Sequence, residues 1–331
     1  MYVLYGFDPS PYSVKMRAIL RYRRLPFIWK AAGNPRDAAL AAGLPPVIPV
    51  LQFPDGRFMN DSTPLAYALE REHPGARSIV PDDPVQAYLS DLLEDFGDEW
   101  VTKMMFHYRW YYDADRAFAQ TWVVTSRDPV MPEGPRQAAM QAFNDRQVGR
   151  MAMVGCTEQN RPIIEDSYRF VLDTLDRHVR AIPFLFGSRP SLADFGLFGQ
   201  LQILSVDPTP MAEMRERAPD VYCWLLRLDD ASGVDGAWRD PSLVPPSTVT
   251  ALLQHCGETY LPFLAANTRA LQAGAGEVAV DIQGRPYAQA PFRYQAKCHD
   301  ALRKKLAALG PDVRRRLDPV LEQAGCLTYL A

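Results

Sequence analysis

Apolar and β-branched residues alternate with turn residues in the first part of the chain, and they predict short strands and helices in turn. Residues 2–7 are aromatic, β-branched or apolar and predict a buried strand, which the Asp-Pro pair at 8–9 ends. A helix should follow, because Ser10 suits a cap position and Pro11 suits the first helical turn. The predicted apolar face of this helix consists of Val14, Ala18, Ile19 and Tyr22.

The next elements extend this pattern to about residue 73. A second strand over 26–29, parallel to the first, precedes a short Ala-rich helix over 34–43. A Pro-interrupted strand over 44–53, a turn at 54–56 and a strand over 57–60 predict a hairpin. A helix capped by Asp61 and Ser62 follows it. This order of elements is that of an α/β thioredoxin-like domain, which we expect over residues 1–76.

Helical periodicity dominates after a linker rich in Pro, Gly and Asp over 74–84. Patterns of helical length cover 85–97, 98–112, 134–153 and 163–182, and a Pro-interrupted loop covers 125–133. We therefore expect an all-α domain over 84–240.

The last ninety residues form a further region, which we call the tail (241–331). It should contain a long helix over 247–272, a β-hairpin around Gln283-Gly284, and helices over 292–309 and 313–323. Its apolar and aromatic residues need burial, so we expect the tail to pack on the helical domain and to narrow the entrance of a pocket there.

Composition excludes several partners and sites. The net charge of −3 gives no general attraction to nucleic acid or to anionic membranes, and no apolar run approaches the ~18 residues that span a bilayer. The first residues enter a strand without a signal-like segment, which favours a cytoplasmic protein. The five cysteines are widely spaced and form no Cys-x-x-Cys pair, so we expect free thiols and no metal site.

Three short segments carry a resemblance to a known family. Ser10-Pro11-Tyr12-Ser13 resembles the active-site turn of serine-type glutathione transferases. Residues 47–51, followed by Asp55-Gly56 and Asp61-Ser62, are similar to that family's glutathione site. Residues 184–195 resemble the start of the family's buried central helix. There Ser191 and Asp194 would form a capping box, with a structural role.

The resemblance implies a glutathione site in the first domain. Ile48-Pro49 would be the dipeptide whose cis bond exposes backbone to the cysteinyl residue, and Asp61 and Ser62 would hold the γ-glutamyl group. Many serine-type members carry a lysine where this chain has Val47, which removes one cationic contact. The implied glutathione-binding residues are Pro11, Tyr12, Ile48, Pro49, Asp61 and Ser62.

Ser10 is the leading catalytic candidate. A hydroxyl donor beside the free N–H groups of a helix start favours a thiolate and lowers its pKa. The alternative is that Ser10 is only a helix cap. Ser13 and Tyr5 are the other hydroxyls that could contact the thiolate, with a first-turn hydroxyl and a strand aromatic as their simpler roles.

Aromatic residues are dense over 100–112. In the family, the corresponding helix faces the glutathione domain and contributes to the electrophile pocket. Helical spacing places one set of side chains on a common face, and the alternative for each is the core between domains. The predicted pocket residues are Trp100, Met104, Tyr108 and Tyr111.

Together these features predict a glutathione transferase-like enzyme that uses glutathione as co-substrate and attacks a small hydrophobic electrophile. The family implies a homodimer. A non-catalytic protein that binds glutathione or another protein is the alternative, favoured by Val47 and the tail. A thiol transferase of the same fold ranks last, because that chemistry requires a cysteine where this chain has Ser10.

Overall fold

The computed structural model describes residues 1–31, 33–75 and 77–331. The N-terminal domain has a four-stranded sheet in the order β2-β1-β3-β4, in which β2 runs parallel to β1 and the other pairs are antiparallel. This confirms the predicted thioredoxin-like order of elements, although most strands and helices are shorter than predicted. Its elements are β1 (Tyr2–Tyr5), α1 (Pro11–Tyr22), β2 (Phe27–Lys30), α2 (Pro35–Ala41), β3 (Val50–Gln52), β4 (Phe58–Asn60) and α3 (Ser62–Glu72).

Side chains alternate between the two faces of the pleated strand β1, and this explains which of its residues are buried. Leu4 is fully buried and lies between Trp29 of β2 and Leu51 of β3, whereas Val3 and Tyr5 on the other face are partly exposed.

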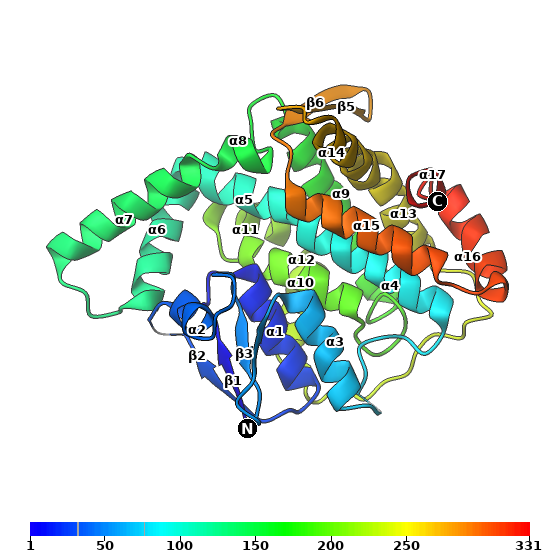
Figure 1. Cartoon of the computed structure of the whole chain (residues 1–331), viewed down its shortest axis with the longest axis horizontal. Helices are drawn as coiled ribbons and strands as arrows, with labels where there is room; N and C mark the ends of the chain where they lie inside the picture. Colours follow the sequence, from blue (N-terminus) through cyan, green and yellow to red (C-terminus); the bar gives the residue numbers. More distant parts are fainter. Residues whose placement is uncertain (32, 76) are drawn as a thin grey trace.

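The helical domain confirms the expected all-α architecture (Figure 1). Residues 84–111 form one uninterrupted helical rod with a π-helical segment, where two helices were predicted. The helix α6 was not predicted. With α7 it projects from the body of the molecule (Figure 1). The elements are α4 (Pro84–Phe96), η1 (Gly97–Val101), α5 (Thr102–Tyr111), α6 (Asp113–Arg127), α7 (Glu133–Val148), α8 (Met151–Val154), α9 (Arg161–Ala181), α10 (Leu192–Leu204), α11 (Pro208–Arg217) and α12 (Pro219–Asp229).

The start of α10 has the geometry of a capping box. The Ser191 hydroxyl accepts from the Asp194 N–H at 3.4 Å, and the Asp194 carboxylate accepts from the Ser191 N–H at 2.8 Å and from the Leu185 N–H at 3.0 Å. Burial raises the pKa of Asp194 to about 6. Further along α10, a Cβ on Gly199 would lie 2.8 Å from the Pro11 carbonyl oxygen, so glycine allows α10 to approach the start of α1. This close approach at Gly199 places the start of α1 directly against α10.

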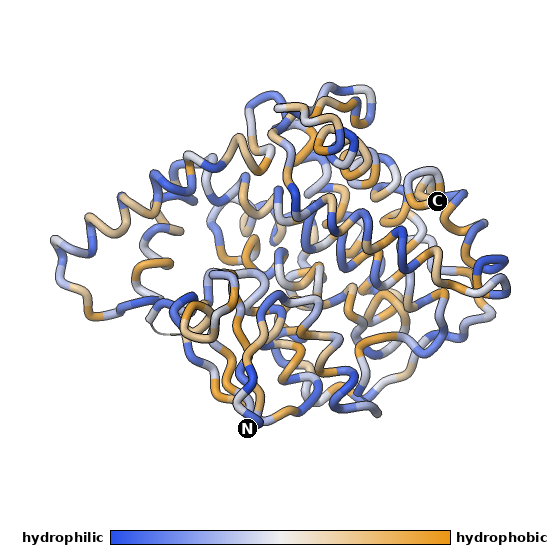
Figure 2. The backbone as a smooth tube through the Cα atoms, in the orientation of Figure 1, coloured by the Kyte–Doolittle hydropathy of each residue, from blue (hydrophilic) through white to orange (hydrophobic). Residues whose placement is uncertain are grey.

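The tail contains the predicted β-hairpin, and its helices alternate hydrophilic and hydrophobic residues (Figure 2). α13 contacts α9, and α15 contacts α4. Lys305 of α15 forms an ion pair with Asp91 of α4 at 2.8 Å. The limits 1–76, 84–240 and 241–331 stay a prediction. The tail elements are α13 (Ser247–His255), η2 (Cys256–Tyr260), α14 (Leu261–Ala273), β5 (Val278–Ile282), β6 (Arg285–Gln289), α15 (Arg293–Ala307), α16 (Pro311–Gln323) and α17 (Leu327–Leu330).

Within the described ranges, no helix is both long and apolar enough to cross a membrane.

Candidate functional site

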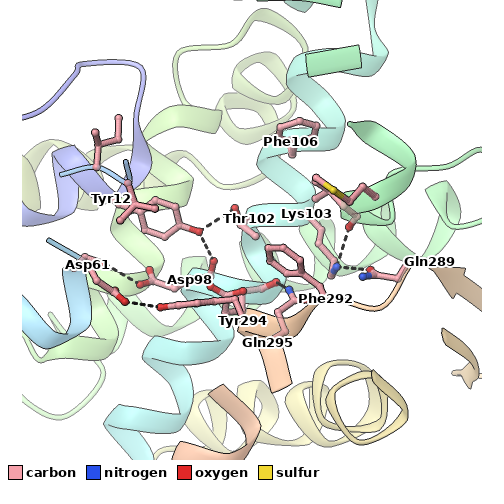
Figure 3. Close-up of a pocket in the computed structure, with 16 residues that line it drawn as sticks. Tyr12, Asp61, Asp98, Thr102, Lys103, Phe106, Gln289, Phe292, Tyr294 and Gln295 are labelled. Atoms are coloured by element: carbon pink, nitrogen blue, oxygen red, sulfur yellow. Dashed lines mark hydrogen bonds between the residues drawn. The ribbon is translucent and has the colours of Figure 1, made fainter. Parts of the chain in front are cut away.

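A cavity of about 450 Å³, here called the main cavity, lies where the first domain, the α4–α5 rod and the tail meet (Figure 3). The first domain contributes the starts of α1 and α3 and the segment before β3. The lining residues are Tyr12, Val47, Ile48, Asp61, Ser62, Asp98, Glu99, Thr102, Lys103, Phe106, Met153, Val154, Gln289, Phe292, Tyr294 and Gln295.

Asp61 has an unusual position at the start of α3. Its φ of 75° lies in the left-handed region, which is unfavourable for a residue with a side chain. Its carboxylate makes no capping hydrogen bond to α3 and instead lines the main cavity, where the Tyr294 hydroxyl donates to it at 3.0 Å. Burial raises the pKa of Asp61. The first N–H groups of α3 therefore have no cap from this side chain.

A buried charge network supports this side of the cavity. The Lys15 ammonium lies 2.6 Å from the Glu94 carboxylate and 2.6 Å from the Asp98 carboxylate. The Ser62 hydroxyl donates to Asp98 at 3.4 Å, and the Tyr12 hydroxyl donates to the Asp98 carbonyl oxygen at 2.9 Å. Burial raises the pKa of Asp98 even beside Lys15. The network ties α1 and α3 to the helical rod.

The π-helical segment and the start of α5 form the opposite wall. Burial raises the pKa of Glu99 well above its usual value, and the neighbouring Asp95 and Asp98 raise it further. Burial lowers the pKa of Lys103 to about 8. The Lys103 ammonium donates to Gln289 at 2.7 Å and to the Val154 carbonyl oxygen at 2.9 Å. Burial therefore disfavours the charged form of both Glu99 and Lys103 in this wall.

The tail supplies four lining residues, Gln289, Phe292, Tyr294 and Gln295. Figure 3 shows Tyr294 reaching across to Asp61. The sequence predicts that the tail narrows a pocket, but none of these four residues is among the predicted site residues. The only feature in the sequence that could have identified these residues is that two of them are aromatic.

A second cavity of about 220 Å³, here called the side cavity, adjoins the main cavity. Tyr12, Ile48, Thr102 and Phe106 line both cavities. The side cavity is also lined by Phe7, Pro9, Ser10, Pro11, Asn34, Pro35, Arg36, Met105, Arg109, Trp110, Val123, Arg127, Phe143 and Gln147.

Ser10 is the N-cap of α1, and its hydroxyl oxygen accepts from the Ser13 N–H at 3.4 Å. It lines the side cavity, next to Ile48, whose bond to Pro49 is cis. Ser13 is fully buried outside both linings, and Tyr5 lies at a separate surface hollow with its hydroxyl directed to Gln52. Of the three candidate hydroxyls, only that of Ser10 reaches either cavity.

The structure places the four predicted pocket residues away from both cavities. Trp100 and Met104 are buried in the core, Tyr108 donates to Glu213, and Tyr111 donates to Glu158 at the surface. Other positions of the same helix, Thr102, Lys103 and Phe106, face the cavities. The side chains of Trp100, Met104 and Tyr108 pack in the core, and neighbouring positions of α5 line the two cavities.

Titratable residues do not gather into a metal site in the described part of the chain. The five cysteines are free thiols, and burial raises the pKa of Cys156 to about 12. Lys15 and the carboxylates of the charge network are paired with one another and belong to the support of the main cavity.

Comparisons with known proteins bear on the first domain. Residues 4–77 match the family model described as glutathione S-transferase, N-terminal domain, and this segment contains Ser10, Ile48, Asp61 and Ser62. No curated protein sequence matches the chain.

Similar solved structures include a glutathione S-transferase from Methylobacterium radiotolerans in complex with glutathione sulfonate, 22% identical, covering 73% of this chain and 99% of that chain with a TM-score of 0.42. A beta-etherase from Sphingobium is 18% identical and covers 69% of this chain and 94% of that chain, with a TM-score of 0.49. A glutathione S-transferase from Methylobacillus flagellatus is 19% identical and covers 70% of this chain and 94% of that chain, with a TM-score of 0.39.

Proposed function

We propose that the protein binds glutathione across the two cavities and activates the thiol for attack on a small hydrophobic electrophile, because its residues 4–77 match the glutathione S-transferase N-terminal domain. One observation carries the proposal: the Asp61 carboxylate leaves the start of α3 uncapped and faces the main cavity. An ammonium group would pair with this carboxylate, and a carboxylate would bind the free N–H groups beside Ser62.

Because the two cavities share lining residues, glutathione would extend from one cavity into the other in a defined orientation. With its γ-glutamyl end at Asp61 and Ser62, the cysteinyl residue would pass Ile48, which lines both cavities. The thiol would then enter the side cavity near Ser10. There the hydroxyl donates to the thiolate, and the N-terminus of α1 adds its positive dipole end. The thiolate sulfur bonds to the electrophilic carbon, the leaving group departs with its bonding pair, and the thiol proton passes to solvent.

The first prediction tests binding. Asp61→Asn should weaken glutathione affinity by at least about 2 kcal/mol, because it removes the charge that pairs with the ammonium group. Calorimetric titration of glutathione measures this, and Asp82→Asn, at an exposed aspartate outside both cavities, is the matched control. Equal affinity of the two variants would remove Asp61 from the site.

The second prediction tests catalysis. Ser10→Ala should lower kcat with 1-chloro-2,4-dinitrobenzene by about 100-fold or more, because the thiolate loses its hydroxyl donor, while glutathione affinity changes little. Ser13→Ala is the matched control, since that hydroxyl is buried outside both cavities. If both variants keep full turnover, Ser10 is a helix cap only.

A non-catalytic glutathione-binding protein is the second candidate. Two observations favour it: Val47 stands where many family members have a lysine, and Tyr294 of the tail already donates to Asp61. Binding of glutathione without turnover of an aryl halide, an epoxide or a disulfide would decide for it. The predicted pocket residues Trp100, Met104, Tyr108 and Tyr111 lie outside both cavities and are not part of this proposed site. The homodimer stays a prediction.

A further inference from the structure

The side cavity contains arginines without acidic partners. Its lining includes Arg36, Arg109 and Arg127 but neither aspartate nor glutamate. Arg109 is neutralised by Asp207, with a distance of 2.8 Å between Nε and Oδ2. Among the residues that the structure describes, Arg36 and Arg127 form no ion pair within 4 Å. Two positive charges therefore face a small cavity beside Ser10.

Arg127 is held in an apolar setting. Its guanidinium carbon lies 5.2 Å from the ring centre of Phe7 and 5.2 Å from that of Phe143. Its Nε is buried without a hydrogen-bond partner, and so is the Oε1 of Gln147 in the same lining. Burial lowers the pKa of Arg127, and the nearby Arg36 and Arg146 lower it further.

In the described lining of the side cavity, no carboxylate balances the positive charges of Arg36 and Arg127. Arg127 is partly buried, and its buried Nε loses hydration that no hydrogen bond in the described part of the protein replaces, which costs free energy of folding. A planar anion with two oxygens would restore the balance, because the guanidinium fork matches a carboxylate in a bidentate manner. The aromatic residues Phe7, Phe106, Trp110 and Phe143 would surround a flat ring attached to that anion.

We propose that the side cavity is an anion pocket and that the second substrate is an aromatic acid, with its carboxylate on Arg127 and Arg36 and its ring beside the Ser10 hydroxyl. The substrate assignment rests on the proposed function, whereas the anion pocket can be tested without it. It narrows the predicted hydrophobic electrophile to one that carries a negative charge. The glycyl carboxylate of glutathione has the same chemistry and is separated from the second substrate by the experiment.

The experiment compares 4-chloro-3-nitrobenzoate with its neutral analogue 4-chloro-3-nitrobenzamide by calorimetry on the full chain without glutathione. The benzoate should bind more tightly than the benzamide. Arg127→Gln should weaken benzoate binding by about 10- to 100-fold, the range of a hydrogen bond to a charged group, and should leave the benzamide within twofold. Arg127→Lys should restore part of the loss.

Two further variants keep the test decisive. Arg36→Gln, on another helix, should also weaken the benzoate selectively, even if Arg127→Gln does not fold. Arg150→Gln is the matched control, because this arginine is exposed and lies outside the lining. Equal binding of benzoate and benzamide by the unaltered protein overturns the proposal.

Glutathione titration of the same variants separates the two carboxylates. The proposal expects unchanged glutathione affinity in Arg127→Gln. If this variant loses glutathione affinity and keeps benzoate affinity, the arginine binds the glycyl carboxylate and the proposal is overturned. If the unaltered protein binds no glutathione but selects the benzoate through Arg127, the anion pocket is supported and the glutathione proposal fails.

Discussion

Replacing Lys15 with methionine is expected to lower the free energy of unfolding by roughly 3–5 kcal/mol, because it leaves two buried carboxylates without their cation. The Lys15 side chain is fully buried, and its ammonium lies 2.6 Å from both Glu94 and Asp98. Methionine keeps most of the volume, so the lost charge dominates the effect. Burial alone lowers the pKa of Lys15, but the two carboxylates outweigh it and hold that pKa above its usual value.

The effect should depend on pH in one direction. Burial already raises the pKa of Asp98 above its unfolded-state value, and without Lys15 this folded-state pKa should rise further. The folded variant then binds more protons than the unfolded chain, so its stability increases as pH falls from 8 to 5. Urea denaturation at both pH values measures the difference, with the exposed Lys297→Met as control. A loss below about 1 kcal/mol, or an equal loss at both pH values, would contradict the role given to Lys15.

The first domain could be predicted because its signals are local. A cap and an early proline at Ser10-Pro11, a hairpin turn at 54–56 and alternating apolar positions each act within a few residues. Short-range preferences of this kind agree with the final packing, so the order of strands and helices was predicted correctly. The family resemblance added Ile48-Pro49, which no local preference identifies.

For the helical rod, the surroundings of the side chains could not be predicted from local patterns. Helical spacing correctly groups Trp100, Met104 and Tyr108 on one face, but spacing does not say which neighbour covers that face. The tail covers part of it, since the Trp100 ring lies 6.0 Å from Phe263 and 5.8 Å from Tyr287. The cavities are lined instead by neighbouring positions of the helix, among them Thr102, Phe106 and Trp110. A π-helical turn at 97–101 also shifts the faces, and the sequence gives no clear sign of it.

The contact between Tyr294 and Asp61 could not be predicted for a related reason. It joins residues 233 positions apart, through a hydroxyl on the first turn of α15 and a carboxylate in a left-handed conformation. Neither feature belongs to a periodic pattern. The arginines of the side cavity are similar, because Arg36 and Arg127 come from helices on either side of it and each resembles an ordinary surface arginine in the sequence.

The packing of the tail leads to the second large effect. Cutting the chain after Arg239 should abolish the cooperative thermal transition rather than shift it. The cut removes Tyr260, Phe263 and Tyr287, all buried against Trp100. Full burial of one large apolar side chain contributes about 1.5–3 kcal/mol, and a domain has only about 5–15 kcal/mol of stability. Several such losses together exceed the stability of the whole protein.

Circular dichroism melting and binding of a dye that reports exposed apolar surface measure the result of this truncation. Phe263→Ala is the partial version, and it should cost about 3–5 kcal/mol because the side chain is fully buried. Phe118→Ala is its control, since Phe118 is 39% exposed and should cost much less. If the shortened chain melts as the full chain does and binds no dye, the tail is a separate unit and does not complete the core around Trp100. The same tail places the Tyr294 hydroxyl at Asp61. If the shortened chain is stable, a glutathione titration of it measures whether glutathione binds more tightly without that hydroxyl.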